Sequence, residues 1–188
     1  IKRRPTKQIA VGDVLIGRDA PISVQSMTKT DTRDVNLTVS QIKGLEEAGC
    51  EIVRCAVPDL DAAKALKSIK QKVNIPIVAD IHFHYQLALE SLKSGVDCLR
   101  LNPGNIRDRS KVELIVKEAK QREVPIRIGV NFGSLPPVGK IGLRGGISRH
   151  KDGVNELPKE RETGETYTIV DHMVKTGLWE ISILEDLD

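Results

Sequence analysis

The amino-acid sequence predicts an α/β fold with a parallel sheet, and two observations lead to this prediction. Strand-like apolar segments alternate with amphipathic helical segments from residue 22 onward, an order typical of βαβ units with right-handed crossovers. The chain has 188 residues, 39% of them hydrophobic, which is enough for one domain with a sizeable core. A (β/α)₈ barrel needs eight strands and about 250 residues. We therefore expect a TIM barrel truncated after about five βα units, with an open five-stranded sheet as the alternative.

An N-terminal β-hairpin is expected within residues 1–20. Two short apolar runs, residues 8–11 and 14–16, flank Gly12-Asp13, a pair typical of a tight two-residue turn. Residues 21–188 would then form the partial barrel.

The barrel strands are predicted from short apolar runs, and the helices from apolar residues that recur every three or four positions. The predicted strands cover residues 22–25, 52–57, 75–81, 97–101 and 125–130, and the predicted helices cover about 37–48, 59–73, 85–94, 110–119 and 166–187. Gly49 and Gly95 are predicted to end the first and third helices. Ser110 and Glu113 have the spacing of a capping box, which would begin the fourth helix.

A long mobile surface loop is expected at residues 135–165. This stretch contains Pro136, Pro137, six glycines and several basic residues without periodicity, and loops of this length are usually functional or disordered. Gly139-Lys140 does not fit a phosphate-binding loop, because that motif requires serine or threonine after the lysine.

Charge and composition exclude several classes of function. The net charge is only +3 and aromatic residues make up 3% of the chain, which argues against a nucleic-acid partner. No apolar run reaches the roughly 18 residues of a membrane span. The basic start lacks an apolar signal core, so we expect a cytoplasmic protein.

Three cysteines, Cys50, Cys55 and Cys98, show no CxxC pairing. An odd number without that spacing is typical of small buried residues in a reducing compartment. We therefore expect no metal site formed by this chain's cysteines alone.

Three predicted strands each carry an arginine within their apolar run, namely Arg54, Arg100 and Arg127. Arginine is rarely buried without a partner, and its planar guanidinium matches phosphate with paired donors. We expect these arginines on successive parallel strands, where a shared anionic ligand is a better interpretation than three unrelated ion pairs. The alternative for Arg54 is an ion pair with a helix carboxylate.

Polar residues also follow the predicted strands, at the sheet edge where parallel α/β folds bind ligands. Pairs two residues apart point to the same side; they are Asp80 with His82, Arg100 with Asn102, and, across Gly129, Arg127 with Asn131. Gln25, Ser26 and Thr28 close the first strand. Gly129 would leave room for a ligand to approach the backbone. The alternatives are a hydrogen-bonded Asp80–His82 pair that holds a loop, and a simple turn at residues 102–105.

Four segments together resemble one enzyme family. They are Val24-Gln25-Ser26-Met27-Thr28, Val78-Ala79-Asp80-Ile81-His82-Phe83, Arg100-Leu101-Asn102-Pro103-Gly104-Asn105 and Pro125-Ile126-Arg127-Ile128-Gly129-Val130-Asn131. The pattern is similar to 4-hydroxy-3-methylbut-2-enyl diphosphate synthase of the non-mevalonate isoprenoid pathway. The resemblance covers about residues 1–134 and resumes at 183–188.

The resemblance implies a TIM barrel followed by a small domain that holds a [4Fe-4S] cluster with three cysteines and a glutamate-type ligand. The reaction it implies is reductive ring opening of 2-C-methyl-D-erythritol 2,4-cyclodiphosphate to hydroxymethylbutenyl diphosphate, with electrons from flavodoxin or ferredoxin and a homodimer in the full-length form. It further implies that four residues grip the cyclic diphosphate, namely Arg54, Arg100, Arg127 and Asn131. Asp80, His82 and Asn102 would lie nearby.

The chain also departs from this family's pattern. Barrel strands six to eight, the CPTC-type cluster motif, and the family's later lysine and glutamate have no counterpart here, and residues 135–165 do not match the family's usual short acidic–basic helix. The cluster would therefore be bound by residues absent from this chain, which alone is expected to be inactive. The alternatives are another phosphate-binding TIM barrel such as a pterin-dependent synthase, or a non-catalytic partial barrel that binds diphosphates or a partner chain.

Overall fold

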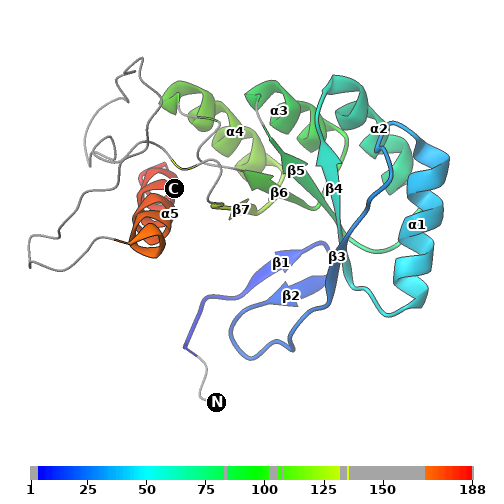
Figure 1. Ribbon diagram of the computed structural model, residues 1–188, viewed down its shortest axis with the longest axis horizontal. Coiled ribbons are helices and arrows are strands. Elements are labelled where there is room, and N and C mark those ends of the chain that lie inside the picture. The colour runs from blue at the N-terminus through cyan, green and yellow to red at the C-terminus, as the bar shows by residue number, and fades with distance from the viewer. Residues whose placement is uncertain are drawn as a thin grey trace, which may run out of the picture.

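A parallel sheet of five strands forms the centre of the protein. The computed structural model describes residues 4–82, 84–101, 106, 108–131, 135 and 168–187. The strand order is β3-β4-β5-β6-β7, so each new strand pairs with the one before it, as in a TIM barrel (Figure 1). The strands are β3 (Gln25–Met27), β4 (Ile52–Val57), β5 (Ile77–Ile81), β6 (Cys98–Leu101) and β7 (Ile126–Ile128).

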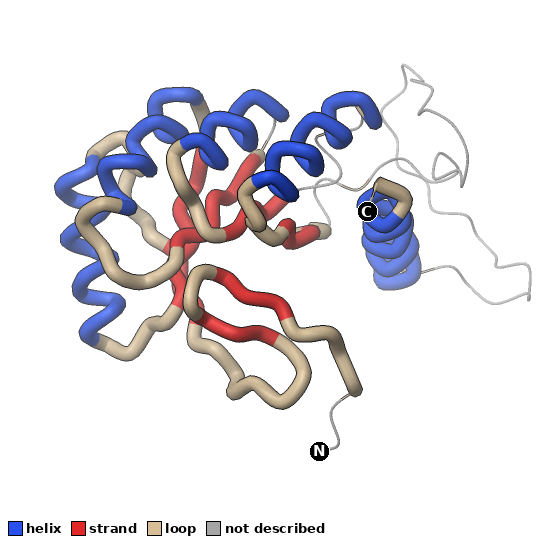
Figure 2. The backbone as a smooth tube through the Cα atoms, turned by 180° about the vertical axis from the view of Figure 1, so that it is seen from behind, coloured by secondary structure: helices blue, strands red, loops and turns tan. Residues whose placement is uncertain are grey.

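Helices follow the strands and cover the outer face of the sheet. They are α1 (Val35–Glu47), α2 (Leu60–Lys70), α3 (Tyr85–Lys93), α4 (Arg109–Gln121) and α5 (Ile169–Glu185). Figure 2 shows α1 to α4 along one side of the strands, with the hairpin on the other side. Leu66, Ile77, Leu99 and Ile115 are fully buried between the sheet and these helices, and each such side chain contributes about 1.5–3 kcal/mol by burial.

The hairpin covers the amino-terminal end of the inner face. Its strands β1 (Ile9–Val11) and β2 (Val14–Ile16) pair antiparallel, as predicted. Val11 is buried in a cluster with Ile52, Val78 and Cys98, from β4, β5 and β6. The apolar residues of the hairpin thus close one end of the inner face.

The sheet curls as a barrel wall does. Nη1 of Arg127 on β7 donates to Oε1 of Gln25 on β3 over 2.7 Å, although these are the two edge strands. In a flat sheet the edges would lie roughly 19 Å apart, at about 4.8 Å per strand, which is farther than these side chains reach. This contact therefore favours the truncated barrel over a flat open sheet.

Several predicted elements are confirmed, and others begin elsewhere. Gly49 and Gly95 follow α1 and α3 with φ of +88° and +84°, the left-handed conformation that favours glycine. The first barrel strand was predicted at residues 22–25 but lies at Gln25–Met27. The prediction was wrong because the apolar side chains that suggested it, Ile22 and Val24, are exposed.

The predicted capping box of α4 is wrong. The cap is Asp108, whose side chain accepts hydrogen bonds from the backbone N–H and the hydroxyl of Ser110. Ser110 lies inside the helix, and Glu113 instead pairs with Arg109 one turn earlier. The apolar face predicted for this helix is nevertheless buried, at Val112, Ile115, Val116 and Ala119.

Helix α5 begins a few residues later than predicted. Thr168 caps it in a capping box with Asp171, in which each side chain accepts from the other residue's backbone N–H. Except for Leu135, the loop predicted at 135–165 lies outside the described residues. Within the described chain, no helix has the length and apolar composition that a membrane span requires.

Candidate functional site

A layer of charged side chains follows the apolar layer on the inner face. Arg54, Asp80 and Arg100 each stand two residues after a residue that packs under the hairpin, namely Ile52, Val78 and Cys98. Because side chains alternate along a strand, these charged residues point to the same inner face, nearer the carboxyl ends. Arg127 lies beside Arg100 in the register of β6 and β7. We call Arg54, Asp80, Arg100 and Arg127 the charged layer.

Asp80 lies at the centre of the charged layer. Its Oδ1 accepts a hydrogen bond from Nη1 of Arg100 over 2.9 Å, and its Oδ2 lies 3.3 Å from Nε of Arg54. Nε2 of His82 is 3.4 Å from the same Oδ2. The Asp80 side chain is only 3% exposed, so one buried carboxylate holds two guanidinium groups and a histidine.

The strand order corrects one expectation about the arginines. Arg100 and Arg127 lie on neighbouring strands, but Arg54 does not, because β5 runs between β4 and β6 and contributes Asp80. Arg54 is paired, as the alternative proposed, but with a strand carboxylate rather than a helix carboxylate. The contacts join Arg54 and Arg100 through a single anion, so they are not unrelated ion pairs.

Gly129 has a different role from the one expected. A Cβ atom added to it would overlap the guanidinium of Arg100, and its carbonyl accepts a hydrogen bond from Nη2 of Arg100 over 3.0 Å. The space beside Gly129 is therefore occupied by Arg100 rather than left for a ligand.

The remaining predicted site residues are placed as follows. His82 follows β5 and contacts Asp80 as above, which agrees with the paired alternative. Asn131 comes three residues after β7 and is exposed. Asn102 lies outside the described residues. The structure thus brings together Arg54, Asp80, His82 and Arg100, with Arg127 beside them.

The cysteines are buried, as predicted. Cys50, Cys55 and Cys98 are all free thiols in the interior. Burial raises the pKa of Cys55 and of Cys98 to about 11, and a thiol with so high a pKa is a poor metal ligand because metals bind the thiolate. The described residues contain no group of three or more His, Cys, Asp or Glu that could hold a metal ion. These cysteines do not fit an iron–sulfur cluster.

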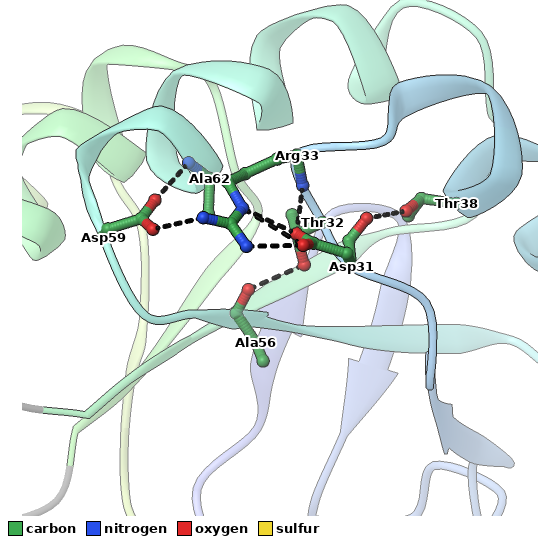
Figure 3. Close-up of polar contacts among 7 residues, drawn as sticks. All are labelled: Asp31, Thr32, Arg33, Thr38, Ala56, Asp59 and Ala62. Atoms are coloured by element: carbon green, nitrogen blue, oxygen red, sulfur yellow. Dashed lines mark hydrogen bonds and ion pairs between the residues drawn. The ribbon is translucent and has the colours of Figure 1, made fainter.

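The loop after β3 is fastened at the carboxyl end of the sheet (Figure 3). Arg33 binds Asp31 through Nε and Nη2, and its Nη1 lies 3.2 Å from Asp59, which caps α2. The hydrogen bonds from Arg33 lower the pKa of Asp31 to about 2. Buried Thr32 donates its hydroxyl to the carbonyl of Ala56 over 2.7 Å. These contacts hold the loop against β4 and α2.

Sequence reasoning missed this loop and one buried carboxyl. The only signal for the loop was the Asp31-x-Arg33 spacing, which is too common to carry a prediction.

Glu180 on α5 is 6% exposed, and burial raises its pKa to about 7. Among the described residues its Oε1 has no hydrogen-bond partner. It lies on one helix face with His172 and Thr176, which are also buried.

The fold and the charged layer define the class of protein. A curled parallel sheet, outer helices and charged residues near the carboxyl strand ends are the features of a TIM-barrel domain. Residues 6–188 match the family model of the GcpE TIM-barrel domain, and the chain belongs to this family.

Named relatives agree with this assignment. The chain is 55% identical over its whole length to 4-hydroxy-3-methylbut-2-en-1-yl diphosphate synthase (flavodoxin) of Dehalococcoides mccartyi, of which it covers 47%. It is 62% identical over 136 residues to the protein of the same name from Thermodesulfovibrio yellowstonii, covering 72% of this chain and 39% of that protein. The chain spans about half the length of these curated relatives.

A solved structure supports the fold alone. Dihydropteroate synthase of Yersinia pestis aligns with a TM-score of 0.51 at 10% identity, covering 64% of this chain and 45% of that protein. At this identity the likeness concerns the barrel architecture and not the activity.

Proposed function

We propose that this chain supplies part of the diphosphate-binding barrel of an enzyme of isoprenoid biosynthesis by the non-mevalonate pathway. The reaction would be the reductive opening of 2-C-methyl-D-erythritol 2,4-cyclodiphosphate to hydroxymethylbutenyl diphosphate. The names of the relatives support this proposal, and the single observation that carries it is the charged layer. A pterin-dependent synthase has support only from the fold, at 10% identity.

The charge of the layer matches that of the proposed substrate. Three guanidinium groups and one carboxylate give a net charge of +2, with His82 counted as neutral. The cyclic diphosphate carries one negative charge on each of its two phosphates. We propose that Arg54, Arg100 and Arg127 bind these oxygens, since a guanidinium offers paired donors and stays charged at any working pH. Asn131 would add an amide contact, with His82 and Asn102 nearby.

The electrons would come from outside this chain. We propose a [4Fe-4S] cluster bound by residues that this chain does not contain, with flavodoxin, as in the relatives' names, or ferredoxin as the donor. The three cysteines present do not fit a cluster, and no step of the proposed reaction is assigned to them. We also propose that the full-length protein is a homodimer.

The arginines provide the test of this proposal. A charge-assisted hydrogen bond contributes about 1.5–3 kcal/mol, so Arg100→Ala or Arg127→Ala in the full-length protein should weaken kcat/KM by about tenfold to a hundredfold. Lysine at either position should rescue activity only in part, because it supplies the charge without the planar fork. Steady-state kinetics and calorimetric titration with the cyclic diphosphate measure both effects.

A surface arginine serves as the control. Arg122 pairs with Glu118 on α4, away from the charged layer, so Arg122→Ala should keep parental kinetics. If Arg100→Ala and Arg127→Ala bind the cyclic diphosphate as tightly as the parent but unfold at lower temperature, the arginines are structural ion-pair partners and the proposal is wrong.

A further inference from the structure

We propose that Asp80 is a positioning residue, which aligns Arg54 and Arg100 for the anion and does not itself contact the ligand. This inference rests on the proposed function. It differs from the expectation that Asp80 belongs to the ligand-binding set, and it follows from the contacts and burial of its carboxylate.

Both oxygens of the Asp80 carboxylate already have partners. Oδ1 accepts from Arg100, and Oδ2 faces both Arg54 and His82. With a side chain 3% exposed, Asp80 presents almost no surface to a ligand. A carboxylate next to a phosphate would also repel it, because like charges at short range disfavour each other.

Each of the two guanidinium groups is held from two sides, with Asp80 as the shared anchor. Arg100 donates from Nη1 to Asp80 on β5 and from Nη2 to the carbonyl of Gly129 after β7. Arg54 pairs with Asp80 through Nε, and its Nε and Nη2 contact the sulfur of Met27 on β3 at 3.3 and 3.2 Å. Two anchors fix the plane of a guanidinium.

Fixing the planes in advance strengthens binding. A free arginine side chain has many rotamers, and ordering them on binding weakens the affinity. A guanidinium carries five N–H donors, and the contacts above leave donors of both arginines for an anion. The buried carboxylate thus acts before the ligand arrives, by ordering the groups that receive it.

Neutralising Asp80 separates positioning from simple charge. Asp80→Asn makes the layer more positive by one charge, so electrostatics alone predicts tighter binding of a dianion. Positioning predicts the opposite, because an asparagine amide cannot hold two guanidinium groups as a carboxylate does. We expect at least tenfold weaker binding of 2-C-methyl-D-erythritol 2,4-cyclodiphosphate to the full-length protein, by calorimetric titration. Unchanged or tighter binding would overturn the inference.

Asp97 provides a matched control at the other end of the same sheet. Its Oδ2 accepts from Nζ of Lys70 over 2.6 Å and from the backbone N–H of Ile77 over 2.7 Å. Asp97→Asn therefore removes a paired carboxylate that is half-buried, whereas Asp80 is buried, and it should lower Tm while leaving the Kd unchanged. A similar loss of affinity in this variant would show that the effect of Asp80→Asn is general destabilisation.

A double-mutant cycle distinguishes positioning from direct contact. If Asp80 acts through Arg100, the loss caused by Asp80→Asn should shrink at least threefold in an Arg100→Ala background. If the full loss persists both in that background and in an Arg54→Ala background, Asp80 contacts the ligand itself and the inference is wrong. The Arg100→Ala variant alone tests the proposed function, because parental affinity for the cyclic diphosphate in this variant would rule out the proposed phosphate pocket.

Asp80→Glu covers the case in which Asp80→Asn does not fold. It keeps the charge and moves the carboxylate by one methylene, so the arginines should shift and the Kd should rise at least threefold. Parental affinity in Asp80→Glu would overturn the inference.

Discussion

Burial governs the chemistry of the individual thiols. Cys55 on β4 and Cys98 on β6 lie in the two buried apolar clusters of the protein, and the thiolate is disfavoured there. Burial raises their pKa to about 11, which leaves roughly one thiolate in a thousand at about pH 8. They are therefore small core residues and not redox groups.

This assignment predicts slow alkylation. In the folded protein Cys55 and Cys98 should react with an aromatic disulfide reagent at least a hundredfold more slowly than in guanidinium chloride, with the time course followed by absorbance at about pH 8. Rapid labelling of either residue in the folded state, located by mass spectrometry, would contradict the assignment.

At the same scale, the sequence pointed to the residues of the charged layer but not to their partners. The arginines and Asp80 stood out because charged residues interrupt apolar strands. Their pairing depends on which strands are neighbours and on the close approach of Gly129 to Arg100. Spacing along the chain does not contain these distances, so a ligand was assigned to space that Arg100 fills.

At the scale of elements, α5 differs from the other helices because all of its buried side chains are polar. Its buried side chains are His172, Thr176 and Glu180, whereas α2 buries chiefly alanine, leucine and isoleucine. Glu180 titrates near neutral pH, because burial raises its pKa from 4.5 to about 7. The attachment of α5 should therefore depend on pH.

Stability should fall as the pH rises, because folded and unfolded states bind the Glu180 proton with different affinities. Below about pH 4.5 Glu180 is protonated in both folded and unfolded states; as pH rises to about 7, the unfolded state releases its proton first and stability falls. Between these two pH values the free energy of unfolding falls by about 3 kcal/mol. Glu180→Gln should match the parent near pH 4.5 and exceed its Tm near pH 8 in thermal unfolding of the full-length protein. Exposed Glu185→Gln, on the same helix, should follow the parent throughout.

A constant difference between Glu180→Gln and the parent across this pH range would show that Glu180 does not titrate as described. Hydrogen exchange of the α5 amides, measured at both ends of the range, would locate any change to this helix.

Some boundaries of helices and strands can be predicted from local sequence patterns alone, and others cannot. The strand Ile52–Val57 and the start of α2 agree with the sequence, because a long apolar run and the capping residue Asp59 act locally. At α4 the sequence predicts a cap at Ser110, but Asp108 is the cap, because its carboxylate accepts from Ser110 itself. Local signals of similar strength cannot be ranked without the surrounding chain.

For the whole molecule, two sheet edges remain open. β3 and β7 each pair with one neighbour within the described chain, and α5 exposes Val170, Val174 and Leu178. Unpaired edges and apolar patches favour association between chains. Residues 1–188 in isolation should therefore be marginally stable or self-associating, as measured by light scattering and thermal unfolding.

The same isolated chain should form no iron–sulfur cluster. Anaerobic reconstitution with iron and sulfide should give no visible absorption typical of a [4Fe-4S] centre, since the thiols present are buried and separated. A stoichiometric cluster would overturn the structural role of these cysteines, and a stable monomer would contradict the consequence drawn from the open edges.

The most direct measurement of the central claim is a crystal structure of the full-length protein with 2-C-methyl-D-erythritol 2,4-cyclodiphosphate bound. We predict that Arg54, Arg100 and Arg127 donate to the diphosphate oxygens, while the Asp80 carboxylate stays on the two arginines that it holds now. A ligand bound elsewhere, with the three arginines still paired only to protein groups, would contradict the phosphate pocket.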